Sequence, residues 1–99
     1  MHEVIEGIAK TAMDGLRDAE MQYEYAEEAK ESGSHEFAML HIEEAKRRLA
    51  GVKEWYDRGM KLMHSDGRHA DSMADVFIEH HKQWYRSLNE KINAFKPGA

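Results

Sequence analysis

Apolar residues recur every three to four positions through most of the chain, which is the spacing of one face of an α-helix. Two polar clusters that contain glycine, at 32–34 and 65–67, interrupt this pattern. No stretch alternates apolar and polar residues as a half-buried β-strand does. The pattern therefore predicts an all-α fold, a single domain over residues 1–99. We expect three long helices, at about residues 2–31, 35–64 and 71–95, in an up-down-up bundle.

Each predicted helix carries one stripe of core candidates. The stripes are Ile5, Ile8, Ala9, Ala12, Leu16, Ala19, Tyr23 and Ala26; Ala38, Ala45, Leu49, Val52, Tyr56 and Met63; and Ala74, Phe77, Ile78, His81, Trp84, Tyr85, Leu88, Ile92 and Phe95. The second helix adds another apolar band along Phe37, Leu40, Trp55 and Leu62.

The apolar faces of the second and third helices are wider than a three-helix core uses. A second chain could cover the surplus in a shared bundle, so we expect a homodimer or larger assembly. The predicted contact residues are Phe37, Trp55, Phe77 and Trp84. The alternative is that Trp55 and the methionines close the core of a monomer.

Glycines are placed symmetrically about Gly33. The numbers of Gly7 and Gly59 sum to 66, as do those of Gly15 and Gly51. In an antiparallel hairpin that turns near Gly33, each pair lies at one height. Glycine inside a helix costs about 1 kcal/mol relative to alanine, so close helix approach or a groove for a tryptophan would explain these positions.

Composition excludes several classes of protein. The chain has no cysteine, so a disulfide scaffold and a thiol nucleophile are excluded. The net charge of −5 has the wrong sign for nucleic acid. No apolar run approaches the length of a membrane span and no cationic signal region begins the chain, so we expect a cytoplasmic protein that binds no membrane. Neither a nucleophile elbow nor a phosphate-binding glycine loop occurs, so no catalytic residue is predicted.

The first predicted hairpin resembles the ferritin-like, rubrerythrin-type helical hairpin. The matching stretches are 23–33, YEYAEEAKESG, and 36–46, EFAMLHIEEAK. The resemblance implies a two-metal site built from a Glu on one helix and a Glu-x-x-His on the next. Aligned on the turn, these ligands fall at Gly15, Arg48 and Gly51, whose side chains cannot hold a metal. The site is therefore absent from its usual place.

Another set of carboxylates and imidazoles offers a different metal site. His41 and Glu44 are three residues apart on one helix, a spacing that can direct both side chains to one ion. Glu27 is level with His41 across the hairpin, and Glu20 lies further along. These four residues could hold iron, manganese or zinc. The alternative is that Glu20–Arg48 and Glu27–His41 form two ion pairs beside the core.

His81 occupies the middle of the third apolar stripe. Burial disfavours the charged imidazolium and lowers its pKa unless an acid compensates. His81 is therefore either a metal ligand or base inside the bundle, or a core histidine bonded to a tyrosine or a carbonyl. Taken together, the sequence favours a non-enzymatic helical-bundle protein that acts through self-association or protein interaction and needs no cofactor. The alternative is a ferritin-like protein that binds a divalent transition metal.

Overall fold

The chain forms three α-helices. The computed structural model describes residues 2–65 and 72–96, and the side chains of 7–59, 61 and 79–96. Helix α1 spans His2–Glu31, α2 spans His35–Ser65 and α3 spans Ser72–Ala94, and the described residues contain no strand. The predicted helices agree with these bounds to within one residue at every end. The all-α prediction is confirmed.

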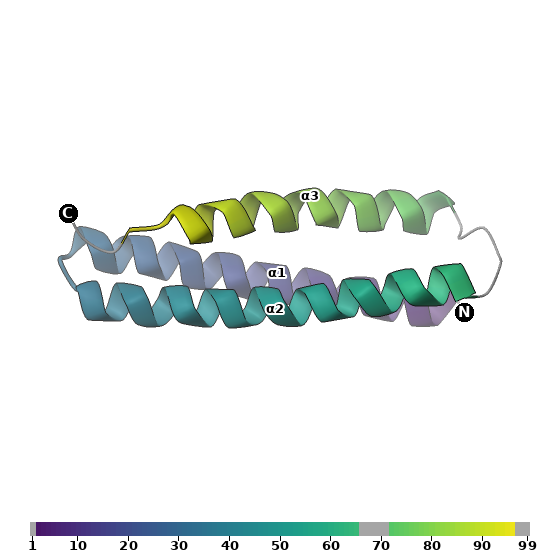
Figure 1. The fold of residues 1–99 in the computed structure, drawn as a ribbon, viewed down its shortest axis with the longest axis horizontal. Coiled ribbons are helices and arrows are strands. Elements are labelled where there is room, and N and C mark those ends of the chain that lie inside the picture. The colour runs from purple at the N-terminus through teal and green to yellow at the C-terminus, as the bar shows by residue number, and fades with distance from the viewer. Residues whose placement is uncertain (1, 66–71, 97–99) are drawn as a thin grey trace.

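The helices lie side by side in a rod with extents of 52 × 17 × 16 Å. Helices α1 and α2 pack against each other along their length as a hairpin, and α3 lies along one side of it (Figure 1). The turn between α1 and α2 is at one end of the rod, and the N-terminus is at the other end (Figure 1). The hairpin therefore has one side that α3 covers and one side that it does not.

The turn at Gly33 ends α1 in a Schellman motif. The N–H of Ser34 donates to the carbonyl oxygen of Ala29 at 2.8 Å, and the N–H of Gly33 donates to that of Lys30 at 3.0 Å. Gly33 has a φ of +79°, in the left-handed region that glycine adopts without steric cost. This turn reverses the chain within three residues and sets the register of α1 against α2.

Small residues let α1 and α2 approach closely. Six of the twelve described hydrophobic residues that are buried in α1 and α2 are alanines: Ala9, Ala12, Ala19, Ala26, Ala38 and Ala45. A Cβ added at Gly15 would lie 2.6 Å from Cγ2 of Val52, and one added at Gly59 would lie 3.3 Å from Cγ2 of Ile8. At both positions the close approach therefore requires glycine or displaces the neighbouring side chain.

The other member of each glycine pair has a different environment. A Cβ added at Gly7 or Gly51 would meet no atom within 4 Å. The level pairs predicted from the sequence thus divide into one glycine that the hairpin packing needs and one that it does not. Gly51, in the middle of α2, leaves bare backbone on the surface of the hairpin.

Helix α3 packs on the hairpin through its apolar stripe. Leu88 and Ile92 are buried in the common core, and Ile42 of α2, which the predicted stripe left out, is buried with them. Two edge-to-face aromatic contacts join the elements, with ring centroids 6.2 Å apart for Tyr56 and Tyr85 and 6.0 Å apart for Tyr23 and Phe95. The stripes predicted for all three helices are confirmed wherever their side chains are described.

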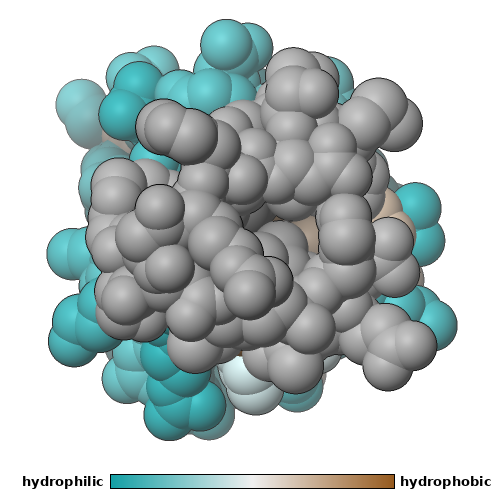
Figure 2. Space-filling model, turned by 90° about the vertical axis from the view of Figure 1, so that its right-hand side faces the viewer, coloured by the Kyte–Doolittle hydropathy of each residue, from teal (hydrophilic) through white to brown (hydrophobic). Residues whose placement is uncertain are grey.

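The surface of the rod is mainly polar. Figure 2 looks along the rod from the end opposite the Gly33 turn, and the coloured side chains visible around it are mostly hydrophilic. None of the described helical segments combines the length and the apolar character that crossing a membrane requires.

Candidate functional site: two sides of the helical hairpin

On the covered side of the hairpin, Glu20 contacts α3. Nε1 of Trp84 donates a hydrogen bond to Oε2 of Glu20 at 2.6 Å, in a part-buried position. Donors to a carboxylate form short, strong hydrogen bonds, and a buried indole N–H needs such an acceptor. Glu20 therefore holds α3 on α1, and its carboxylate is engaged within the chain.

Glu27 lies further along the same side, at the end of α3. It lines a surface pocket of about 650 Å³ together with Lys30 of α1 and Lys91 of α3. Nζ of Lys30 lies 5.4 Å from the ring centroid of Phe95, so the lysine also covers the last aromatic residue of the α3 stripe. Glu27 thus faces lysines and an aromatic ring.

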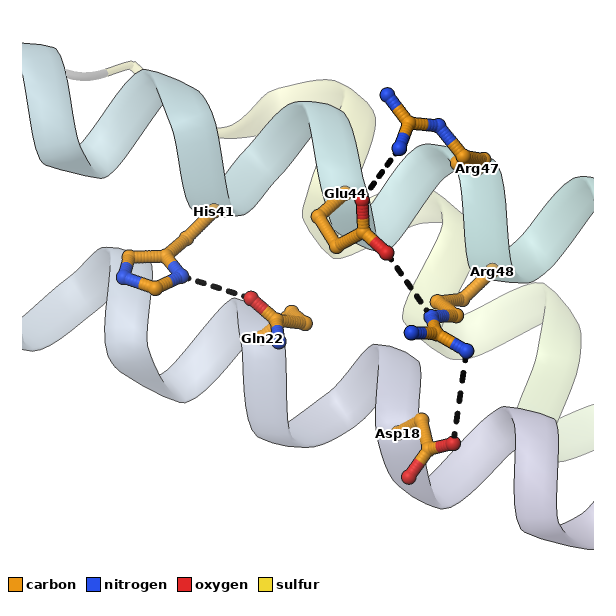
Figure 3. Close-up of polar contacts among 6 residues, drawn as sticks. All are labelled: Asp18, Gln22, His41, Glu44, Arg47 and Arg48. Carbon is orange, nitrogen blue, oxygen red and sulfur yellow. Dashed lines mark hydrogen bonds and ion pairs between the residues drawn. The ribbon is translucent and has the colours of Figure 1, made fainter.

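The uncovered side carries a row of polar contacts, some within α2 and some between α1 and α2. Nδ1 of His41 lies 2.7 Å from Oε1 of Gln22 (Figure 3). Glu44 accepts hydrogen bonds from Arg47 at 2.8 Å and from Nε of Arg48 at 3.0 Å. In Figure 3 these side chains lie on the near side of the hairpin, and α3 passes behind it.

Arg48 also links the two helices of the hairpin. Its Nη1 lies 4.0 Å from Oδ2 of Asp18, and both side chains are about half exposed. The predicted alternative paired Arg48 with Glu20 and His41 with Glu27; the structure pairs Arg48 with Glu44 and Asp18, and His41 with Gln22. Arg48 and His41 each have a partner on α1, as predicted, but neither partner is the predicted residue: Asp18 is two positions from Glu20, and Gln22 is five positions from Glu27.

The four candidate metal ligands fall on opposite sides of the hairpin. Glu20 and Glu27 lie on the side of α3, whereas His41 and Glu44 lie on the uncovered side. Among the described residues, no group of three or more His, Asp or Glu side chains is placed to hold a metal ion. The structure brings His41 and Glu44 together on one helix face but does not bring all four side chains to one point.

A groove runs along the uncovered side. It has a volume of about 520 Å³, and α3 contributes none of its described lining residues. We call it the open groove. It is lined by Thr11, Asp14, Gly15 and Asp18 of α1 and by Glu44, Arg47, Arg48, Gly51, Val52 and Trp55 of α2.

Charge is divided between the two rims of the open groove. The α1 rim carries two aspartates, Asp14 and Asp18. The α2 rim carries Arg47 and Arg48 beside a single acid, Glu44. Across the whole sequence, residues 1–33 hold nine acidic and three basic residues, whereas residues 34–64 hold five acidic and six basic residues. The groove is therefore acidic on one rim and net basic on the other.

Two of the predicted contact residues, Phe37 and Trp55, belong to α2. Phe37 is 62 % exposed, one helical turn before His41, whose ring centroid is 5.4 Å from that of Tyr25. Trp55 lines the groove, and Arg58 lies over its ring, with its guanidinium carbon 5.1 Å from the ring centroid.

The other two predicted contact residues, Phe77 and Trp84, belong to α3. Trp84 is partly buried and packs against the core of its own chain. The side chain of Phe77 lies outside the described residues. Besides Phe37, the exposed large apolar side chains among the described residues are Met21, Tyr25, Met39 and Leu40.

Two titratable side chains are buried where α3 meets the hairpin. His81 is only 2 % exposed, which confirms its predicted place in the core; burial, and secondarily the neighbouring His80, lower the pKa of its imidazole. Burial raises the pKa of the Tyr56 phenol, so Tyr56 stays protonated at neutral pH. Within the described part of the chain, the Tyr56 hydroxyl has no hydrogen-bond partner.

The contact between Glu20 and Trp84 was not predicted from the sequence. The two residues are 64 positions apart, and their meeting depends on the height of α3 along the hairpin. The available signal was chemical, because a tryptophan within an apolar stripe needs an acceptor for its indole N–H. Gln22, which contacts His41, was missed because an amide is not a typical metal ligand or ion-pair partner.

Comparison of the chain with protein-family models, with curated proteins and with solved structures gave no match. The class of the protein therefore follows from its own fold and surface: a three-helix protein with a groove on the side of the α1–α2 hairpin that α3 does not cover.

Proposed function

We propose that this chain is a non-enzymatic helical-bundle protein that acts by associating with a second copy of itself. The observation that carries the proposal is the unequal covering of the hairpin. Helix α3 covers one side, and the other side presents the open groove, which partly buried Trp55 lines. Phe37, also on α2, is exposed. In a bundle, a helical hairpin with one unpartnered side is completed by further helices.

The proposal includes the up-down-up arrangement of the protomer. The short turn at Gly33 supports an antiparallel α1–α2 pair, and α3 returns along the same rod. With two such protomers, the uncovered sides of both hairpins would meet in a shared core. Apolar side chains near the turn, including Tyr25 and Leu40, are exposed, which supports a second protomer that covers them.

Sedimentation equilibrium of the full chain tests this function. The proposal expects a concentration-dependent rise from the monomer mass of 11.5 kDa toward a dimer or a larger closed assembly. A mass that stays at 11.5 kDa up to the highest soluble concentration would contradict it.

The rival proposal is a carboxylate and histidine protein that binds iron, manganese or zinc. It requires a site made of side chains that include His41 and Glu44, and among the described residues these two bind Gln22, Arg47 and Arg48 instead. Elemental analysis of protein purified without an affinity tag, after incubation with each metal, separates the two functions. Stoichiometric metal would favour the rival, and substoichiometric metal would remove it.

A further inference from the structure

The open groove is unusual in its distribution of charge, and this feature carries an inference that rests on the proposed self-association. Its acidic rim is on α1 and its net basic rim is on α2. A surface of this kind is complementary to a copy of itself only when each acidic rim meets a basic rim. Charge therefore selects among the ways in which two copies can be arranged.

Two copies related by a two-fold axis can stack their hairpins in two ways. An axis parallel to the helices places α1 of one copy on α2 of the other, so that aspartates face arginines. An axis perpendicular to the helices and parallel to the stacked faces places α1 on α1, so that Asp14 and Asp18 face the same aspartates. Like charges that face each other disfavour an interface, so the parallel axis is favoured.

We propose that two copies of this chain dimerise through the open groove about a two-fold axis parallel to the helices, with both Gly33 turns at the same end. Such an axis keeps every residue at its own height. Asp18 and Arg48 lie at one height within the hairpin, 4.0 Å apart. In the dimer, Asp18 therefore faces Arg48 of the second copy, and the two pairs form a ring of alternating charges around the axis.

A second argument for this dimer comes from the residues one helical turn away from the ring of charges. Gly15 and Gly51 lie one turn further from the Gly33 turn, and Gly51 has nothing within 4 Å of the place where a Cβ would be. Glycine is among the least favourable residues in a helix interior, and the packing within the hairpin does not require it at position 51. In the dimer, the space left by the missing side chain at Gly51 can receive the Trp55 rings. Trp55 lies one helical turn beyond Gly51 on the same face of α2.

A matched pair of variants tests the place of contact. Gly51→Gln introduces a helix-favouring side chain into the groove, and it has room for its Cβ in the monomer. Ala50→Gln places the same side chain at the adjacent exposed position, which does not line the groove. We expect Gly51→Gln to raise the dimer dissociation constant by about tenfold or more while circular dichroism remains helical, and Ala50→Gln to leave it unchanged.

A second matched pair tests the charge ring. Asp18→Lys and Glu24→Lys change the net charge by the same amount, and both side chains are exposed on α1, but only Asp18 lines the groove. In the proposed dimer, a lysine at position 18 faces Arg48 of the second copy. We therefore expect Asp18→Lys to weaken the dimer and Glu24→Lys not to do so. Equal dissociation constants for the two variants would overturn the charge ring.

Distance between two labels tests the orientation. The chain has no cysteine, so Ser32→Cys provides a single site for a nitroxide label beside the turn. The proposed dimer places the two labels at one end, separated by less than half the 52 Å length of the rod. Labels separated by nearly that length would overturn the parallel axis, and a dimer that survives Gly51→Gln would overturn contact through the open groove; both results leave self-association standing. A chain that stays monomeric, with its groove open to a different protein, would overturn both.

Discussion

The indole of Trp84 and the carboxylate of Glu20 join α3 to α1 through a hydrogen bond of 2.6 Å between residues 64 positions apart in the chain. Backbone hydrogen bonds within a helix cannot fix the position of one helix on another. A directional contact between two part-buried side chains can, because it is lost when α3 slides or rotates. This contact therefore specifies where α3 lies along the hairpin.

Removing the donor should destabilise the fold. Trp84→Phe keeps an aromatic ring but leaves the Glu20 carboxylate without its donor, and we expect the free energy of unfolding to fall by about 1–3 kcal/mol. Glu20→Gln retains an amide oxygen as acceptor and should cost less than Trp84→Phe. Urea unfolding followed by circular dichroism measures both. Equal stability of Trp84→Phe and the wild type would show that the hydrogen bond contributes nothing net.

The two central glycines should respond to alanine in opposite directions. Gly15→Ala places a Cβ 2.6 Å from Cγ2 of Val52, a β-branched side chain with little freedom to move, so we expect a loss of stability despite the better helix propensity of alanine. Gly51→Ala meets nothing within 4 Å and should gain about 0.5–1 kcal/mol from helix propensity.

Chemical denaturation of both glycine variants, at a concentration where the chain is monomeric, provides the comparison. The variants differ only in the position of one methyl group at the same height of the hairpin. A stabilising effect of Gly15→Ala would mean that α1 and α2 are less closely packed at Val52 than the structure has them.

The third prediction concerns the buried hydroxyl of Tyr56. It has no hydrogen-bond partner within the described part of the chain, and a buried polar group without one is costly. Tyr56→Phe removes the hydroxyl and keeps the ring that packs edge-to-face on Tyr85. We expect the midpoint of thermal unfolding to rise, by an amount equivalent to about 1 kcal/mol. As a control, Tyr25→Phe removes a hydroxyl from an exposed ring and should change stability little.

Buried His81 should make stability fall in mild acid. Burial and His80 lower the pKa of His81 in the folded chain from its usual value of 6.5, so the unfolded chain binds a proton first as the pH decreases. Unfolding therefore takes up a proton between pH 6.5 and the lower folded pKa, and stability is lost across that window. Above pH 6.5, this residue contributes no pH dependence.

The measurement compares the wild type with His81→Leu at several pH values, because the other histidines contribute to both proteins. The wild type should lose stability more steeply than the variant as the pH falls below 6.5. His80→Gln is the matched control: it removes an exposed neighbour and should leave most of the steepness in place, since burial is the larger cause. Parallel pH profiles for the wild type and His81→Leu would contradict the prediction.

Most of the helical architecture could be predicted from local patterns. The 3.6-residue periodicity and the turn at Gly33 gave helix bounds within one residue, and the sum of residue numbers placed Gly15 level with Gly51. Arg48, which was predicted to be level with Glu20, contacts Asp18 instead, two positions away on α1. Height within a hairpin follows from the turn alone. Close approach at Gly15 was also one of the two explanations considered, and contact with Val52 supports it.

The side of the hairpin on which each residue lies was harder to predict from the sequence. Glu20 and His41 both border the α1–α2 core, yet one contacts α3 and the other lies on the uncovered side. Periodicity places a residue at an angle around its own helix, but only the position of α3 decides what that angle faces. That position depends on contacts between distant residues such as Glu20 and Trp84, which no local pattern encodes.

The two tryptophans of the chain lie on opposite sides of the hairpin: Trp84 of α3 contacts Glu20 on the covered side, and Trp55 lines the open groove. The protein therefore contains two native tryptophan fluorophores that report separate events. With Trp55 replaced by Phe, the remaining emission follows the attachment of α3 to its own hairpin. With Trp84 replaced by Phe, it follows whatever occupies the groove. One spectroscopic signal can thus resolve folding of the protomer from occupation of its free side without an added label.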